Sequence, residues 1–241
     1  EAKYLEFITT ELPFARQSVT LKLLDKVSFA SEVSNFVNDR AKKKAKQFLV
    51  DHQETFQEAY NQTCVSPFIV ASILWVETRY GEETPTFPVL SVLISLSALR
   101  YSAIREAVLP AAFAYAKDRP ERYEDLSLVK DWDERAKSIG EKWYPELRAY
   151  FKLIKKFQWS DETARSMKGS FAGAMWNSQL MPTTAVKLLA KKKFDPTSWD
   201  DSIRLAAQWL KEKGTGYNKA QWYWDAVFEL AAYLNQQSPL F

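Results

Sequence analysis

The sequence predicts a mainly α-helical protein with at most a small β element. Six glycines and ten prolines in 241 residues are too few for a turn-rich all-β protein. Apolar residues recur at helical spacing along most of the chain, and alternation is confined to stretches that allow at most a few short strands. With 46% hydrophobic and 26% charged residues, the chain has the composition of a globular protein with a sizeable core.

The first half of the chain predicts helices joined by short connections. Residues 19–60 indicate two or three helices, because large apolar residues recur every three or four positions. Residues 67–80 predict another helix, with Ser66 as its N-cap, Pro67 in its first position and Gly81 as its stop. Buried helices then continue up to residue 117.

The second half begins with the most polar long stretch, residues 117–146, for which we expect a surface excursion with some helix. A loop of small residues leads into a helix from about Thr183. The next helix ends at Gly214 and has Ser198 or Asp200 as its cap. A helix rich in aromatic residues closes the chain.

Several classes of protein are disfavoured by composition. Cys64 is the only cysteine, which excludes an intramolecular disulfide and a cysteine-rich metal site. His52 is the only histidine and lies in a polar helical stretch, where we expect it to be exposed. A net charge of +3 is too small an excess to argue for nucleic acid, and the lysine clusters at 39–48 and 187–194 are interpreted as solvated helix faces. No apolar run approaches the length of a membrane span.

One acid, Glu77, lies within the otherwise apolar run "ILWVETRYGEETPTFPVL". It follows Ile73 and Leu74 by one helical turn and therefore shares their face, whereas Arg79 is rotated away from Glu77 by about 200°. Loss of hydration raises the pKa of a carboxyl group, which can then keep its proton near neutral pH and donate it to a leaving group. The alternative is that Glu77 pairs with a Lys or Arg from elsewhere in the fold.

Four segments, in the same order, resemble the lytic transglycosylase B family of peptidoglycan-cleaving enzymes. "VSPFIVASILWVETRYG" resembles its catalytic-glutamate segment, and "KGSFAGAMWNSQLMPTTA" resembles its second signature. "SWDDSIRLAAQWLKEKG" and "YNKAQWYWDAVFELAAYL" resemble the helix that follows and the closing segment. The resemblance implies a lysozyme-like fold of the goose-lysozyme and lytic-transglycosylase type.

The resemblance also implies a reaction. Glu77 would protonate the glycosidic oxygen between N-acetylmuramic acid and N-acetylglucosamine, then take the proton of the muramyl C6 hydroxyl, giving a 1,6-anhydro end. We expect peptidoglycan glycan strands as the partner, a periplasmic or secreted location, a monomer, and no metal or organic cofactor. The residues expected to contact substrate are Ser170, Gln179, Tyr217, Asn218, Tyr223 and Trp176, the last standing where the family usually has glycine.

Departures from the family pattern leave alternatives open. The family's adjacent arginine pair is missing, and only Arg100, Arg105 and Arg135 lie near its place. The excursion around 100–140 is longer than the family's, and we expect it to be an atypical insertion. From the resemblance we expect an N-terminal helical segment, 1–60, that packs on a lysozyme-like catalytic domain, 61–241. The alternatives are a hydrolytic muramidase that acts on modified glycan, such as deacetylated glycan, and an inactive peptidoglycan-binding scaffold.

Overall fold

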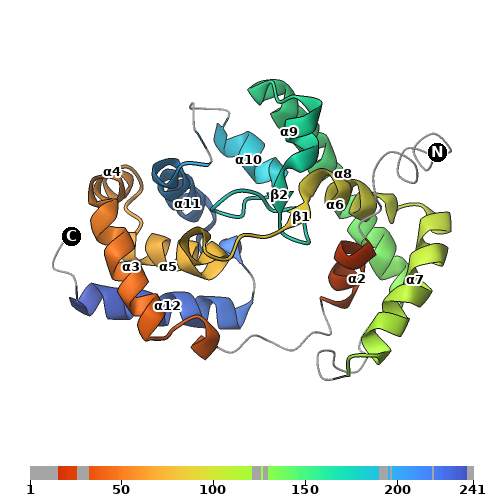
Figure 1. Ribbon diagram of the computed structural model, residues 1–241, viewed down its shortest axis with the longest axis horizontal. Helices are drawn as coiled ribbons and strands as arrows, with labels where there is room; N and C mark the ends of the chain where they lie inside the picture. Colours follow the sequence, from red (N-terminus) through yellow and green to blue (C-terminus); the bar gives the residue numbers. More distant parts are fainter. Residues whose placement is uncertain are drawn as a thin grey trace. The chain divides into compact units, whose positions relative to one another are not determined.

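The computed structural model describes residues 16–25, 33–120, 126, 130–189, 195, 197–218 and 220–237. The described part is mostly helical, with one two-stranded antiparallel sheet formed by β1 (Phe87–Pro88) and β2 (Lys168–Gly169). This confirms the predicted fold class (Figure 1). None of the described helices is long and apolar enough to cross a membrane.

The described residues group into two compact units. The α8 unit consists of the described residues up to 25 together with 85–175 and 180–187. The α5 unit consists of the described residues of 33–84, 176–179 and those from 188 onward. The division into a segment 1–60 and a domain 61–241 follows a different criterion, resemblance to a family, and stays a prediction.

The α5 unit is a bundle built around one apolar helix. Helix α5 packs against its neighbours α3, α4, α11 and α12, and Figure 1 shows α12 running beside it. These contacts bury most of the α5 surface, which explains why its sequence is apolar nearly all round. The bounds are α3 (Asp39–Asp51), α4 (Gln53–Thr63), α5 (Pro67–Thr78), α11 (Trp199–Lys213) and α12 (Gln221–Gln237), with short 3-10 turns η1 (Val33–Asn35), η2 (Arg79–Gly81) and η4 (Gly214–Tyr217).

Helix α5 begins where the sequence predicts and ends two residues early. Pro67 occupies its first position and Ser66 its N-cap, although the Ser66 side chain makes no capping hydrogen bond. The helix stops at Thr78 because Arg79 adopts a left-handed backbone conformation, with φ of 51°. The residue predicted as the stop, Gly81, instead closes the 3-10 turn that follows.

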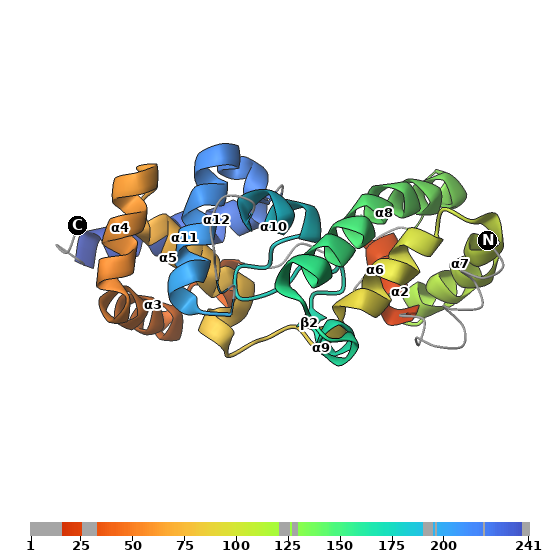
Figure 2. The same cartoon turned by 90° about the horizontal axis from the view of Figure 1, so that it is seen from above.

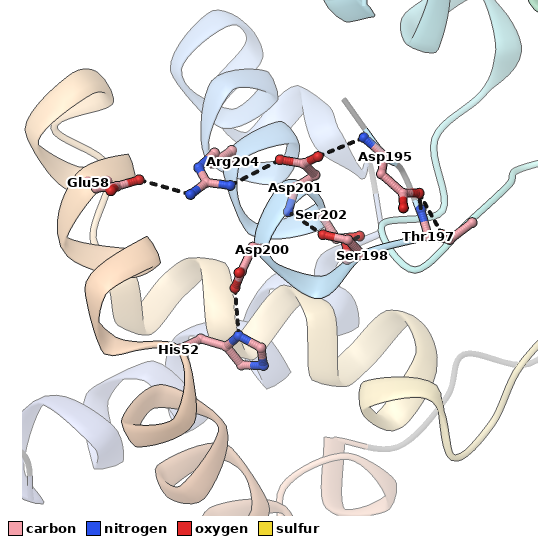
Figure 3. A network of polar contacts seen from close by, with 9 residues as sticks. All are labelled: His52, Glu58, Asp195, Thr197, Ser198, Asp200, Asp201, Ser202 and Arg204. Atoms are coloured by element: carbon pink, nitrogen blue, oxygen red, sulfur yellow. Dashed lines mark hydrogen bonds and ion pairs between the residues drawn. The ribbon is translucent and has the colours of Figure 1, made fainter. Parts of the chain in front are cut away.

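Polar contacts fix α11 to its neighbours (Figure 3). The Ser198 hydroxyl accepts a hydrogen bond from the Asp201 backbone N–H at 3.1 Å, so Ser198 is the cap among the two residues predicted. Arg204 of α11 joins Asp201 at 3.0 Å and Glu58 of α4 at 2.9 Å. The helix start and its packing against α4 are therefore stabilised by one connected set of charges.

The expected exposure of His52 is wrong. Its side chain is 23% exposed, lies 4.6 Å from the Phe48 ring and places Nδ1 2.8 Å from Oδ1 of Asp200 (Figure 3). The pKa of Asp200 is lowered, chiefly by this hydrogen bond. Polar neighbours in sequence gave no sign of a partner 148 residues away.

The α8 unit is organised around the pair α6 and α8, with α2 and α7 beside them (Figure 2). Gly140 allows α8 to approach the end of α6 closely, since a Cβ at this position would lie 2.2 Å from the backbone N of Arg100. The bounds are α2 (Arg16–Leu24), α6 (Val89–Ala98), α7 (Ser102–Lys117), α8 (Trp132–Phe157), α9 (Asp161–Ser166) and α10 (Pro182–Leu189).

The region around 100–140 contains α7, within the stretch predicted as helix up to residue 117, and the start of α8, within the polar stretch predicted to hold some helix. Arg105 is buried and donates to the carbonyl oxygens of Leu99 at 3.0 Å and Arg100 at 2.9 Å. Arg135 donates to the carbonyl oxygen of Leu23 at 2.8 Å. Two of the three arginines near the missing pair therefore hold backbone segments of the unit together.

Candidate active site

Glu77 lies in the last turn of α5 and keeps part of its surface accessible. The hydroxyl of Tyr223, on α12, donates a 2.7 Å hydrogen bond to Oε1 of Glu77. Among the described residues, no Lys or Arg forms an ion pair with Glu77. In the described part of the chain, therefore, Glu77 is not neutralised by a cation from elsewhere in the fold, which was the alternative interpretation.

The environment of Glu77 changes its protonation. Loss of hydration on burial raises its pKa from 4.5 to about 7, and the smaller effect of the Tyr223 hydrogen bond opposes this rise. The raised pKa favours the protonated form of Glu77 at a pH where an exposed carboxyl group would be ionised. A carboxyl group in this state can donate a proton and, after losing it, accept another.

Arg79 points away from Glu77, as predicted. Its guanidinium donates to the carbonyl oxygen of Asn35 at 2.6 Å and lies over two rings, 4.6 Å from the centroid of Phe36 and 5.0 Å from that of Trp75. The Trp75 indole N–H also donates to the Phe36 carbonyl at 2.8 Å. Through these contacts Arg79, two residues after the candidate acid, holds the η1 segment against the end of α5.

The backbone after Glu77 turns sharply. Arg79, Tyr80 and Gly81 have φ values of 51°, 53° and 85°, a region in which side chains other than glycine are strained. Tyr80 is held there by a 3.0 Å hydrogen bond to the carbonyl of Ala71 and by stacking on Phe48 at 4.0 Å. This role could not be predicted from the sequence, since Phe48 and Trp199, which contact the Tyr80 ring, belong to helices distant in sequence.

The loop 176–179 lies against the end of α5 and the start of α11. The Thr78 hydroxyl is 3.5 Å from the backbone carbonyl oxygen of Asn177. The side-chain amide of Asn177 donates to the Thr197 carbonyl at 3.1 Å. Trp176 is buried and has a φ of 63°. The Gln179 amide donates to the Trp176 carbonyl at 2.6 Å, so these two predicted substrate residues shape one tight loop.

Asn218 and Tyr223 flank the start of α12. The Asn218 side-chain oxygen accepts from the backbone N–H of Ala220 at 3.0 Å, and its carbonyl accepts from the Trp224 indole at 2.7 Å. Trp224 is buried and packs in the core of the α5 unit. The backbone of Tyr217 ends η4, but its side chain lies outside the described part of the chain.

Ser170 belongs to the α8 unit and organises the glycine-rich loop after β2. Its hydroxyl accepts from the backbone N–H groups of Ala172 at 3.2 Å and Ala174 at 3.0 Å. Gly169 is needed because a Cβ would meet the Ala174 carbonyl oxygen at 2.2 Å, and Gly173 because its φ is 88°. The loop is thus built by backbone constraints that side chains larger than hydrogen would break.

No metal ligand set accompanies this site. In the described ranges, no group of three His, Cys, Asp or Glu side chains is placed to hold a metal ion. On the α5 unit, the Glu77 carboxyl group is partly desolvated and hydrogen-bonded to the hydroxyl of Tyr223.

A carboxyl group whose pKa is raised by an apolar environment is the general acid of lysozyme-type glycosidases. The sequence comparison is more specific, because the model of the Transglycosylase SLT domain family matches residues 25–228. The chain belongs to this family, and it is an enzyme of the class that cleaves peptidoglycan glycan strands. A comparison with curated protein sequences finds no match.

Solved structures share the fold. The soluble lytic transglycosylase SltB1 from Pseudomonas aeruginosa has a TM-score of 0.65 and 17% identity, with 98% of each chain covered. The Escherichia coli lytic transglycosylase Slt35 in complex with bulgecin A has a TM-score of 0.66 and 16% identity, covering 98% of this chain and 92% of that one. SltB3 from Pseudomonas aeruginosa in complex with NAG-NAM-pentapeptide has a TM-score of 0.57 and 18% identity, covering 89% of this chain and 49% of that one.

Proposed function

We propose that the chain cleaves the β-1,4 bond between N-acetylmuramic acid and N-acetylglucosamine in peptidoglycan, with Glu77 as general acid and then general base. The observation that carries the proposal is the state of Glu77, whose pKa is raised by burial to about 7 and whose hydrogen-bond partner is the Tyr223 hydroxyl. A catalytic acid works best when its pKa lies near the operating pH. Membership in the transglycosylase family supports the substrate class.

The reaction needs one carboxyl group and no water. Protonated Glu77 gives its proton to the glycosidic oxygen as the bond to the muramyl C1 breaks and positive charge develops on the ring. The resulting carboxylate takes the proton of the C6 hydroxyl while O6 forms a bond to C1. Glu77 ends protonated, and the muramyl end is a 1,6-anhydro sugar. The Tyr223 hydroxyl stabilises the carboxylate between the two steps, when Glu77 carries its charge.

The remaining candidate residues are proposed to bind the sugars around the broken bond. The Gln179 and Asn218 side chains each use one hydrogen bond to hold their own loop, and the Ser170 hydroxyl accepts two. The hydrogen-bonding capacity that remains on each side chain is assigned to substrate. Trp176 is proposed to stiffen the 176–179 loop from a buried position and thereby to shape the sugar site. Tyr217 is proposed as a further sugar contact on the family resemblance alone.

The setting follows from the substrate. We propose that the protein is a periplasmic or secreted monomer that acts on glycan strands and does not bind nucleic acid. We propose that the reaction uses no metal or organic cofactor. The segment 1–60 is proposed to pack on a catalytic domain, 61–241. SltB3 has been solved with NAG-NAM-pentapeptide and with NAG-anhNAM-pentapeptide, which supports peptidoglycan as the class of ligand. Activity that persists after dialysis against a chelator is expected.

Mass spectrometry of the muropeptides released from sacculi tests the proposal. A transglycosylase yields muramyl ends that are lighter by one water than the reducing ends left by a hydrolase. Predominant anhydro ends are expected. Reducing ends, especially from de-N-acetylated sacculi, would support the hydrolytic muramidase instead. Binding of sacculi without any released product would identify an inactive scaffold.

A further inference from the structure

Helix α8 exposes two large aromatic side chains on one face. Large hydrophobic residues are exposed at few of the described positions, namely Val50, Tyr60, Tyr144, Phe151 and Phe228. Tyr144 is 38% exposed and Phe151 is 51% exposed, and seven residues separate them. Seven residues are two turns of helix, so both rings project from the same side. Single exposed apolar residues are ordinary, but an aligned pair on one face is less so.

Basic residues share this face with the rings. Arg148 and Lys155 follow Tyr144 and Phe151 by four residues each and are exposed, so the four form a row that we call the α8 stripe. Between residues 142 and 157 the only acid is Glu146, and its carboxylate is held by the backbone N–H and hydroxyl of Thr183, at 2.8 and 2.7 Å. The stripe therefore carries net positive charge.

One of the two rings is already fixed in place. The Arg100 guanidinium lies 4.3 Å from the centroid of the Tyr144 ring, and its Nε is 4.0 Å from the carboxylate of Glu141. A ring held by a cation on one side loses little conformational freedom when a ligand stacks on it. The stripe thus combines a pre-ordered aromatic ring, a second exposed ring and two exposed cations.

We infer that the α8 stripe is a binding surface for peptidoglycan glycan strands, in addition to the residues around Glu77. This inference rests on the proposed function. The rise of two helical turns, ~10 Å, is about the length of one disaccharide of an extended β-1,4-linked strand, so the two rings can stack on equivalent sugars. The cations match the carboxylates that peptide stems carry along such a strand. The stripe belongs to the α8 unit and Glu77 to the α5 unit.

Co-sedimentation with purified sacculi tests the inference, using the full chain with Glu77→Gln so that the sacculi stay intact. Adding Tyr144→Ala and Phe151→Ala is expected to weaken binding about tenfold, equivalent to ~1.4 kcal/mol. Adding Arg148→Gln and Lys155→Gln instead should weaken binding and reduce its salt dependence. Because these two cations are exposed, replacing them should leave the fold intact. This variant therefore tests whether the stripe binds sacculi even if the aromatic variant fails to fold.

A matched control removes exposed apolar side chains from other helices, by Val50→Ala on α3 and Tyr60→Ala on α4. It should bind sacculi as the parent does. Unchanged binding of both stripe variants, or an equal loss in the control, would overturn the inference. Stripe-dependent binding to phosphatidylglycerol vesicles, without stripe-dependent binding to sacculi, would also overturn it and indicate a lipid surface.

Activity measurements separate this inference from the proposed function. With Glu77 intact, the aromatic stripe variant should cleave a short soluble glycan fragment at the parent rate and sacculi several-fold more slowly. Loss of cleavage on both substrates to the same degree would contradict a role in strand binding. A parent protein that cleaves neither substrate would refute the proposed function, while the sedimentation result would still decide on the stripe.

Discussion

Replacing Tyr223 by phenylalanine removes the hydroxyl that donates to Glu77 and leaves the buried ring in place. The hydrogen bond is 2.7 Å long and favours the ionised carboxylate, and it opposes the larger effect of burial, so that the pKa of Glu77 is about 7 with both effects present. A hydrogen bond to a charged group contributes ~1.5–3 kcal/mol, and 1.36 kcal/mol corresponds to one pH unit. The pKa of Glu77 should therefore rise in Tyr223→Phe by about one unit or more.

The pH dependence of kcat/KM on a soluble glycan fragment measures this effect. Because the free enzyme must carry a protonated Glu77, activity should decline as the pH rises through about 7, and in Tyr223→Phe this decline should move to higher pH. The rate at the optimum should fall as well, since the carboxylate formed between the two steps loses its donor.

Tyr150→Phe is the matched control for this experiment. Tyr150 is also buried, and its hydroxyl donates to the carbonyl of Ala164 at 2.7 Å, within the α8 unit. Loss of the Tyr150 hydroxyl should lower the free energy of unfolding by ~1 kcal/mol. It should not shift the pH at which kcat/KM declines on the alkaline side of the profile. A Tyr223→Phe profile that superimposes on that of the parent would refute the reasoning that Glu77 titrates under the control of Tyr223.

Three further predictions concern stability, and urea denaturation measures each. Arg79→Ala, which loses the bond to Asn35 and the stacking on two rings, should lower the free energy of unfolding by ~2–3 kcal/mol; a smaller change than ~0.5 kcal/mol would contradict the structural role. Gly173→Ala should cost ~1–3 kcal/mol because its φ is 88°, whereas Gly216→Ala, with no neighbour closer than 3.7 Å to a new Cβ, should cost much less. Glu77 binds its proton more tightly in the folded protein than in the unfolded chain, so its contribution to stability is complete below pH 4.5 and is lost as the pH rises to about 7. As the pH rises from 4.5 to about 7, the free energy of unfolding of Glu77→Gln should therefore increase by up to ~3 kcal/mol relative to that of the parent. A difference in unfolding free energy between the two proteins that does not change with pH would argue against the raised pKa.

The sequence predicts the candidate acid well because its signal is local. The apolar residues of α5 and the position of Glu77 among them lie within a few turns of one helix. Arg79 does not pair with Glu77, as predicted, but it lies beyond the end of the helix and its left-handed backbone, not helical geometry, sets its direction. The glycine-rich loop around Ser170 is similar, since tight turns depend on residues near in sequence. These features required no knowledge of how distant helices pack.

Contacts between distant residues are beyond such reasoning. The Tyr223 hydrogen bond joins residues 146 positions apart, and the contact of His52 with Asp200 joins residues 148 apart. The early end of α5 is also set by tertiary structure, because the left-handed conformation of Tyr80 is stabilised by stacking on Phe48 of another helix. The helices of the 100–140 region are in part predicted, but the contacts of Arg105 and Arg135 with backbone carbonyls of Leu99 and Leu23 are not.

The most direct measurement is the rate at which the parent and Glu77→Gln release soluble muropeptides from sacculi, with equal folding shown by circular dichroism. Glutamine keeps the shape of the side chain but cannot donate or accept a proton in the reaction. General acid–base catalysis contributes about 10²–10⁴-fold, so the variant should be slower by at least about 100-fold. A variant that releases muropeptides within about tenfold of the parent rate would contradict the assignment of Glu77 as the catalytic acid and base.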